Sequence, residues 1–254
     1  MPPALLPRAF FMGHGAAADM GHRGVQSGLA SGASLGGAGA ERVGAVKIKG
    51  VDFAGAIARP GAKPPDRLKQ IAFSGRSNVG KSSLINRLLG RTRARLARVS
   101  ARPGKTREIN FYRVRASLHD ADEVEFFLVD LPGYGYARVP AAMRRGWKPL
   151  IEQYLRGTPD LAGVVQLIDA RHDPTAEDRE MARYLAALGV PTLFVVTKVD
   201  KLSRSRRESQ LRRIVQQLGV DPDQVVPFSA RTGEGRDHLL EALEDLLSEA
   251  REAA

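Results

Sequence analysis

Short apolar runs recur along the chain from about residue 50, and each is followed by a turn signal and then by residues with a helical period. The runs lie at 70–74, 124–130, 161–169, 191–197 and 224–228. Two of them, VEFFLVD at 124–130 and TLFVV at 192–196, are close to continuously apolar, which is typical of strands covered on both faces. The pattern therefore predicts a parallel sheet between layers of helices.

The end of the chain has a helical pattern. Leucines recur three or four positions apart after Asp237, a favourable N-terminal cap. They are Leu239, Leu240, Leu243, Leu246 and Leu247. Strands that alternate with helices over residues 67–254 predict one doubly wound α/β domain with a mostly parallel six-stranded sheet. Ligands of such sheets bind at the carboxyl ends of the strands.

The first 45 residues lack this pattern, since they are rich in Gly and Ala and can bury little. We expect residues 1–45 to be a disordered extension, or to be included only because the start codon was assigned too far upstream. Met12 and Met20 are alternative starts. An organelle transit peptide is a further interpretation, which Arg8 and Arg23 fit. Residues 46–66 are expected to be a linker leading into the domain.

Composition excludes several classes of function. The chain of 254 residues has no cysteine, which rules out disulfides, zinc fingers, iron–sulfur clusters and thiol nucleophiles. It has no run of eighteen apolar residues, so we expect no membrane span. The net charge is +11, and residues 67–113 alone hold 13 basic residues against 1 acidic one. This basic window predicts a polyanionic partner.

A phosphate-binding loop follows the run at 70–74. The sequence GRSNVGKS matches G-x-x-x-x-G-K-[S/T], in which glycines let backbone N–H groups turn towards phosphates at the start of a helix. Lys81 is expected to reach the β- and γ-phosphates, and the Ser82 hydroxyl to ligate Mg²⁺. The expected nucleotide-binding residues are Gly75, Arg76, Ser77, Asn78, Val79, Gly80, Lys81 and Ser82.

Three further strand ends specify the nucleotide. Asp130 can hold Mg²⁺ through water, and the Gly133 N–H can contact the γ-phosphate. The Asp200 carboxylate can accept the N1–H and N2–H₂ groups of guanine, a donor pair that adenine lacks. A backbone N–H near Ser229 could meet guanine O6. The expected residues are Asp130, Leu131, Pro132, Gly133, Thr197, Lys198, Val199, Asp200, Phe228, Ser229 and Ala230.

A second Mg²⁺ ligand is expected between the first helix and Asp130. Thr106, in the loop-like segment Arg91–Arg107, is the natural candidate, because such a loop becomes ordered when a γ-phosphate is present. The metal ligands are therefore expected to be Ser82 and Thr106 directly and Asp130 through water. Lys81, Thr106 and Gly133 are the expected catalytic residues.

These strings together resemble one family. GRSNVGKSSLIN, PGKT, INF, DLPGYGYA, TKVD and FSA are similar to the EngB family (also called YihA/YsxC) of ribosome-biogenesis GTP-binding proteins, in the Era-like branch of Ras-type P-loop GTPases. The likeness covers residues 51–254 and implies a cytoplasmic GTPase that assists assembly of the large ribosomal subunit and is needed for normal growth and septation. It also implies GTP contacts from Gly104, Lys105, Thr106, Arg107 and Glu108. Thr197 stands where many GTPases have Asn.

The sequence lacks a glutamine that commonly orients the attacking water in GTP hydrolysis. Ras-like proteins often place a water-orienting Gln directly after the glycine of D-x-x-G, but this chain has Tyr134 there. We therefore expect slow GTP hydrolysis, stimulated by the ribosome or by K⁺. Relatives in the Era-like branch use an Asn at the position of Asn78 to hold K⁺ beside the phosphates. The alternative is that Asn78 only shapes the loop.

The arginines outside the nucleotide-binding motifs favour RNA as the polyanionic partner. Arg87, the cluster Arg91–Arg107 and the run Lys201–Arg207 suit rRNA phosphates of the large subunit or its precursor. A solvated surface is the alternative, because Arg outnumbers Lys 30 to 9 throughout the chain. Two other functions compete, namely a GTP-regulated cell-division switch acting through a protein partner and a small-molecule phosphotransferase. We expect a monomer with no membrane partner, in the cytoplasm, or in an organelle if residues 1–45 are a transit peptide.

Overall fold

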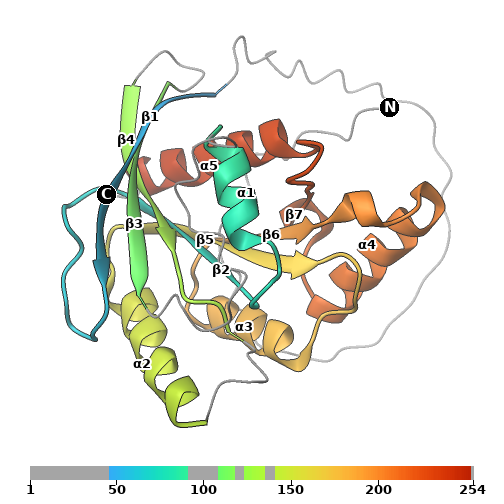
Figure 1. Ribbon diagram of the computed structural model, residues 1–254, viewed down its shortest axis with the longest axis horizontal. Coiled ribbons are helices and arrows are strands. Elements are labelled where there is room, and N and C mark those ends of the chain that lie inside the picture. The colour runs from blue at the N-terminus through green and yellow to red at the C-terminus, as the bar shows by residue number, and fades with distance from the viewer. Residues whose placement is uncertain (1–45, 91–107, 118–122, 135–140, 253–254) are drawn as a thin grey trace, which may run out of the picture.

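A seven-stranded sheet forms the centre of the protein (Figure 1). The computed structural model describes residues 46–90, 108–117, 123–134 and 141–252. The strand order is β1-β3-β4-β2-β5-β6-β7, with β4, β2, β5, β6 and β7 parallel and β3 antiparallel to both β1 and β4. The strands are β1 (Lys47–Ile57), β2 (Gln70–Gly75), β3 (Ile109–Ser117), β4 (Glu123–Asp130), β5 (Leu161–Asp169), β6 (Thr192–Thr197) and β7 (Val225–Pro227). The expected α/β class is confirmed, with seven strands instead of six.

Helices cover both faces of this sheet. They are α1 (Lys81–Leu88), α2 (Ala141–Gly157), α3 (Ala176–Ala187), α4 (Arg204–Leu218) and α5 (Arg236–Glu252), with short 3₁₀ turns η1 (Val199–Lys201) and η2 (Pro222–Gln224). One apolar core packs α1 and α5 against the sheet, and two others pack α2, α3 and α4 against the opposite face. None of the helices in the described part of the chain is both long and apolar enough to cross a membrane.

Two expectations about boundaries are wrong. Residues 46–66 are not simply a linker, because β1 pairs with the whole of β3, from Lys47 opposite Ser117 to Ile57 opposite Ile109. The alternation of apolar side chains in β1 is broken by two register shifts, which hid the strand from the sequence pattern. Asp237 lies inside the first turn of α5 and does not cap it.

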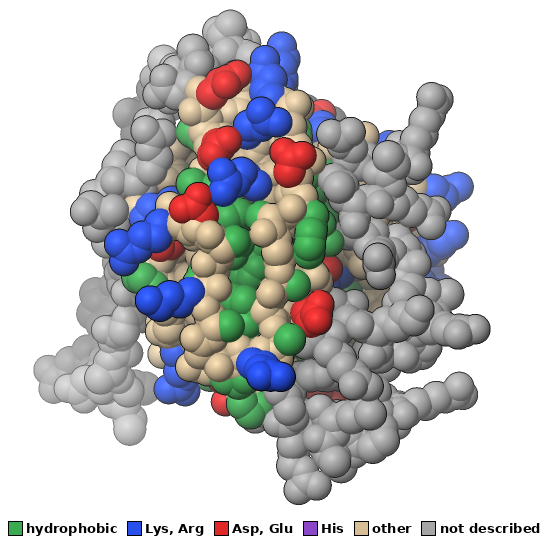
Figure 2. Space-filling view, turned by 60° about the vertical axis from the view of Figure 1, so that its left-hand side comes forward, with side chains coloured by type: hydrophobic (Ala, Val, Ile, Leu, Met, Phe, Trp, Pro, Cys, Tyr) green, Lys and Arg blue, Asp and Glu red, His purple; other side chains and the backbone are tan. Residues whose placement is uncertain are grey.

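The outer part of the β1–β3–β4 surface is polar. Arg113 pairs with Asp66 at 2.9 Å and with Glu125 at 3.6 Å, and Arg115 pairs with Asp52 at 3.6 Å. Figure 2, which looks onto this side, shows positive and negative side chains intermixed around apolar ones. Arg113 and Arg115 are therefore each paired with a carboxylate of a neighbouring described segment.

Candidate functional site

The loop between β2 and α1 is shaped by two residues with left-handed backbone. Asn78 has φ 63° and Gly80 has φ 107°, a conformation that glycine adopts without strain. Gly80 stands immediately before α1 and has no side chain to cap it. The unpaired N–H groups of the first helical turn are therefore left for an anion. This is the phosphate cradle that the sequence predicts.

Lys81 and Asp130 meet at the centre of this cradle. Lys81 Nζ contacts Asp130 Oδ1, and both side chains are buried. Burial lowers the pKa of Lys81 to about 7. Asp130 ends β4, while Ser82 follows Lys81 in the first turn of α1. A carboxylate and a hydroxyl are the oxygen donors that Mg²⁺ prefers when phosphates and water complete its shell, so the residues present fit this ion.

The segment after Asp130 packs directly on the phosphate loop. A Cβ placed on Gly133 would lie 3.3 Å from the backbone N of Ser77, so this position leaves little room for a side chain. Ser77 N–H donates to the Tyr134 carbonyl oxygen at 2.9 Å, and Tyr134 N–H donates to the Gly75 carbonyl oxygen at 3.3 Å. The Gly133 backbone is thereby held beside the phosphate cradle.

The end of β6 is fastened to the same loop. Thr197 Oγ1 lies 2.7 Å from the Val79 carbonyl oxygen and 3.1 Å from that of Ile168. Lys198 Nζ donates to the Asn78 carbonyl oxygen at 2.6 Å and to Asp169 Oδ2 at 2.8 Å. A threonine in the position of the usual Asn therefore still connects this strand end to the phosphate loop through its hydroxyl.

Asp200 is held ready to accept hydrogen bonds. Its carboxylate accepts from the Ser229 hydroxyl at 2.8 Å and from Arg231 Nε at 3.0 Å. Although its burial works in the opposite direction, these bonds lower the pKa of Asp200 from its ordinary value, so the group is ionised at neutral pH. Ser229 N–H donates to the Glu234 carbonyl oxygen. Among the described backbone groups, the Ala230 N–H is therefore the better candidate for guanine O6.

Sequence reasoning missed Asp169 as a site residue. Besides Lys198, it binds Arg171 through two side-chain nitrogens at 2.9 and 2.8 Å. Burial raises the pKa of Asp169, but the hydrogen bonds from Arg171 and Lys198 outweigh it and lower the value to about 2. Its place at the carboxyl end of a buried strand, like that of Asp130, was the signal that could have found it.

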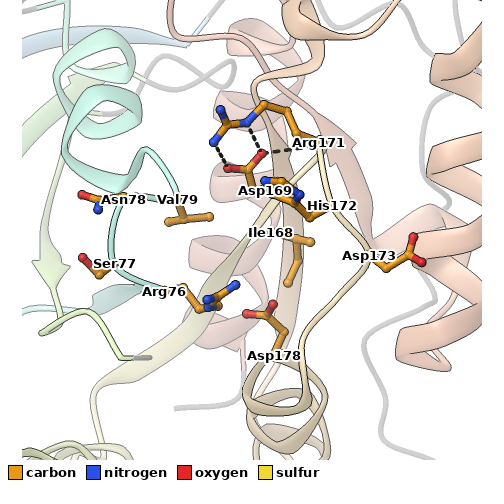
Figure 3. Close-up of a pocket in the computed structure, with 10 residues that line it drawn as sticks. All are labelled: Arg76, Ser77, Asn78, Val79, Ile168, Asp169, Arg171, His172, Asp173 and Asp178. Carbon is orange, nitrogen blue, oxygen red and sulfur yellow. Dashed lines mark hydrogen bonds and ion pairs between the residues drawn. The ribbon is translucent and has the colours of Figure 1, made fainter. Parts of the chain in front are cut away.

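A cavity of about 180 Å³ lies on the side of the phosphate loop that faces α3. Figure 3 shows Arg76 and Asp178 pointing into it from opposite walls, while Ser77 and Asn78 point away. Arg171 turns back to Asp169. The Arg76 side chain thus lies on the far side of the loop from those of Ser77 and Asn78.

Some predicted residues lie elsewhere. Arg87 donates to the Thr232 carbonyl oxygen at 2.9 Å, which supports the loop after β7 and explains this arginine without RNA. Arg207 bonds Glu234 and, at 3.1 Å, the Val199 carbonyl oxygen, so one member of the basic run Lys201–Arg207 has an internal role. Glu108 is exposed just before β3. The segment Arg91–Arg107, with Gly104, Lys105, Thr106 and Arg107, lies outside the described residues.

Four strand ends thus meet at one edge of the sheet. A helix N-terminus with a buried lysine, a carboxylate that could hold a metal and a second carboxylate that could accept from guanine are the arrangement expected of a P-loop GTPase. A family model described as "50S ribosome-binding GTPase" matches residues 70–198, about half of the chain. The protein is a GTP-hydrolysing enzyme that binds GTP and GDP.

Comparison with known proteins shows to which family of P-loop GTPases this chain belongs. The chain is 49% identical to the probable GTP-binding protein EngB of Gemmatimonas aurantiaca over 79% of this chain and 94% of that one. It is 44% identical to that of Geobacter metallireducens over 82% and 98%. It therefore belongs to the EngB family of GTP-binding proteins.

Solved structures agree on the fold. A probable GTP-binding protein engB has a TM-score of 0.55 at 22% identity, over 71% of this chain and 99% of that one. Era in complex with MgGDPNP and nucleotides 1506–1542 of 16S ribosomal RNA has a TM-score of 0.55 at 24% identity, over 69% and 55%.

Proposed function

We propose that this GTPase is a nucleotide-switched assembly factor for the large ribosomal subunit, and that normal septation depends on it through this role. The observation that carries the proposal is the match of residues 70–198 to the ribosome-binding GTPase family, together with an exposed basic surface beside the guanine site. We place the protein in the cytoplasm as a monomer.

The basic surface lies at the start of α4. Lys201, Arg204 and Arg206 are exposed, and neither arginine forms a side-chain ion pair with another described residue. The first turn of α4 contains no acidic residue, so positive charges stand at the positive end of the helix dipole. A polyanion such as rRNA would relieve this unfavourable arrangement. Arg113 and Arg115, by contrast, already have carboxylate partners.

Magnesium would be held by Ser82 and, through water, by Asp130, with Thr106 as the further ligand expected from sequence. The ion neutralises phosphate charge during phosphoryl transfer. Lys81 supplies a positive charge to the phosphates, and the Gly133 N–H orients the terminal one. K⁺ beside Asn78 is proposed to add the charge that an arginine finger provides elsewhere.

Intrinsic hydrolysis is expected to be slow. The Tyr134 hydroxyl is occupied by Asp178 at 2.9 Å and is not positioned to orient a water. Turnover between about 10⁻⁴ and 10⁻² s⁻¹, the span known for unstimulated GTPases, is expected, and replacing Na⁺ with K⁺ should raise it. A rate of the purified protein above about 1 s⁻¹ would contradict this expectation.

Co-sedimentation with ribosomal subunits tests the function. We expect association with the large subunit or its precursor in the presence of a non-hydrolysable GTP analogue, weaker association with GDP, and a steep decline with salt. The double change Arg204→Glu with Arg206→Glu should weaken association. It should also reduce the steepness of the logarithmic salt dependence by about 0.7 to 0.9 for each phosphate that is no longer neutralised.

The matched control is Lys47→Glu with Lys49→Glu, which makes the same change in charge at exposed positions of β1. It should leave association unchanged. If neither nucleotide state binds any ribosomal particle, the assembly proposal is overturned, and a cell-division switch acting through a protein partner becomes the better explanation.

A further inference from the structure

The Tyr134 side chain reaches β5 and α3. Its hydroxyl donates to Asp178 Oδ1 at 2.9 Å, and Gln166 Nε2 donates to the same hydroxyl oxygen. Gln166 is fully buried in β5, and Asp178 is 4% exposed in the first turn of α3. The side chain of one residue in the segment after β4 is thus anchored on two other elements.

The backbone of the same residue is fixed as well. Tyr134 forms a short parallel bridge with Arg76, made by the two backbone hydrogen bonds to Gly75 and Ser77. Gly133, which precedes it, packs against Ser77 so closely that an added Cβ would be crowded. The position of Gly133 therefore depends on where Tyr134 is held.

The phenol is a hydrogen-bond donor in this setting and not a base. Burial, followed by the nearby charge of Asp178, raises the pKa of Tyr134 well above its ordinary value. The hydroxyl stays protonated at neutral pH and can therefore donate a hydrogen bond to the carboxylate of Asp178. A part-buried hydroxyl that loses this acceptor would lose a hydrogen bond, so the bond favours one placement of the tyrosine.

The carboxylate of Asp178 has a second task. Its other oxygen, Oδ2, accepts from the Thr175 backbone N–H and hydroxyl, both at 2.9 Å, and completes the capping box of α3. One side chain thus fixes the start of α3 and the tyrosine together. The Thr175 side chain takes part in the capping box and bonds to Asp178 but not to Tyr134. A substitution of Thr175 can therefore test the capping of α3 separately from the anchoring of Tyr134.

We propose that Asp178 and Gln166 are positioning residues for GTP, because through the Tyr134 hydroxyl they hold the Gly133 N–H where the γ-phosphate is recognised. GDP has no γ-phosphate, so the anchor contributes to the binding of GTP and not of GDP. It therefore raises the affinity for GTP relative to that for GDP without touching the nucleotide. This inference rests on GTP binding and is independent of any ribosomal partner.

Tyr134→Phe tests this directly, since it removes the hydroxyl and keeps the ring. We expect the affinity for a non-hydrolysable GTP analogue to fall two- to tenfold, the range of a single side-chain hydrogen bond, while the affinity for GDP stays unchanged. Single-turnover GTP hydrolysis should slow at saturating GTP as well. Asp178→Asn, whose amide oxygen can still accept from the phenol, should keep most of the affinity for the GTP analogue, whereas Asp178→Ala should lower it as Tyr134→Phe does.

Thr175→Ala is the matched control. It removes the capping hydroxyl of α3 and leaves the bond between Tyr134 and Asp178 in place, so it should lower stability without changing the ratio of GTP-analogue to GDP affinity. The proposal is overturned if Tyr134→Phe leaves that ratio unchanged, raises it, or weakens both nucleotides equally. It is also overturned if Thr175→Ala shifts the ratio as much as Tyr134→Phe. All measurements use the full chain without ribosomes, so failure here leaves the assembly proposal intact.

Discussion

The guanine side of the site and the γ-phosphate side are built differently. On the guanine side, Thr197, Lys198 and Asp200 bond to the phosphate loop, to β5 and to the loop after β7. On the γ-phosphate side, Gly133 packs against Ser77, and its neighbour Tyr134 bonds to the phosphate loop through its backbone and to Asp178 through its hydroxyl. We propose that the first side serves GTP and GDP equally, whereas the second acts only on GTP, which alone has a γ-phosphate. Affinity and discrimination between the two nucleotides are therefore assigned to different parts of the fold.

The largest expected effect is at Asp200. Asp200→Asn replaces a charged acceptor with a neutral group that presents N–H to the donors of guanine. Hydrogen bonds to a charged group contribute about 1.5 to 3 kcal/mol each, so we expect the affinities for GDP and for a GTP analogue to fall at least about 100-fold together. Titration with fluorescent nucleotides measures both.

Asp223→Asn, the same change at an exposed position in η2, is the control and should have no effect. A loss of GTP affinity much greater than that of GDP in Asp200→Asn would mean that the two sides of the site are not separate.

Gly133→Ala tests the γ-phosphate side of the site. The added methyl group meets the backbone of Ser77 at 3.3 to 3.4 Å and pushes the segment away from the phosphate loop. Overpacking of this kind costs about 1 to 3 kcal/mol, so we expect a loss of about five- to a hundredfold for the GTP analogue and little change for GDP. Gly157→Ala at the end of α2, where a Cβ has open space, is the matched control. If Gly133→Ala lowered the affinities for the GTP analogue and for GDP equally, the guanine side and the γ-phosphate side would not have separate roles.

The smallest effect concerns Asp169 and pH. Its pKa of about 2 in the folded protein lies below the ordinary value of 3.8, so its contribution to stability is fully present above about pH 4 and is lost as the pH falls through 2. Asp169→Asn should lower the free energy of unfolding by about 1 to 2 kcal/mol at pH 7. Urea unfolding at pH 7, 5 and 3 should show the gap to the unchanged protein narrowing only at the lowest pH.

Asp66→Asn is the comparison variant for this series, because the pair of Asp66 with Arg113 is exposed and exposed ion pairs contribute little. It should destabilise the protein less than Asp169→Asn at pH 7. A gap for Asp169→Asn that stays constant from pH 7 to 3 and below would contradict the assigned ion pair.

The sequence predicted those parts of the site that depend on local order. The phosphate loop, the strand ends at Asp130 and Asp200 and the residues near Ser229 could be recognised because each combines a buried strand with a turn of fixed chemistry. The structure brings them together, as the bonds from Lys81 to Asp130 and from Ser229 to Asp200 demonstrate. Their contacts with GTP and Mg²⁺ remain predictions.

The rest depends on pairings between distant segments. Asp178 lies 44 residues from Tyr134, and nothing in either neighbourhood indicates the other. Asp169 gains its role only when the ends of β5 and β6 lie side by side. Strand β1 was missed for a different reason, since its bulges disturb the period of two that reveals half-buried strands.

The pairing of β1 with the full length of β3 also determines where the protein can be shortened. A polypeptide starting at residue 67 would contain all of the nucleotide-binding motifs, yet it would lack the strand that covers the edge of β3. The free N–H and C=O groups of that edge would then form a template for other chains, and uncovered strand edges promote aggregation. Such a polypeptide would also lose the buried side chains of Val51 and Ile57, so we expect it to be less soluble and less stable than the full chain.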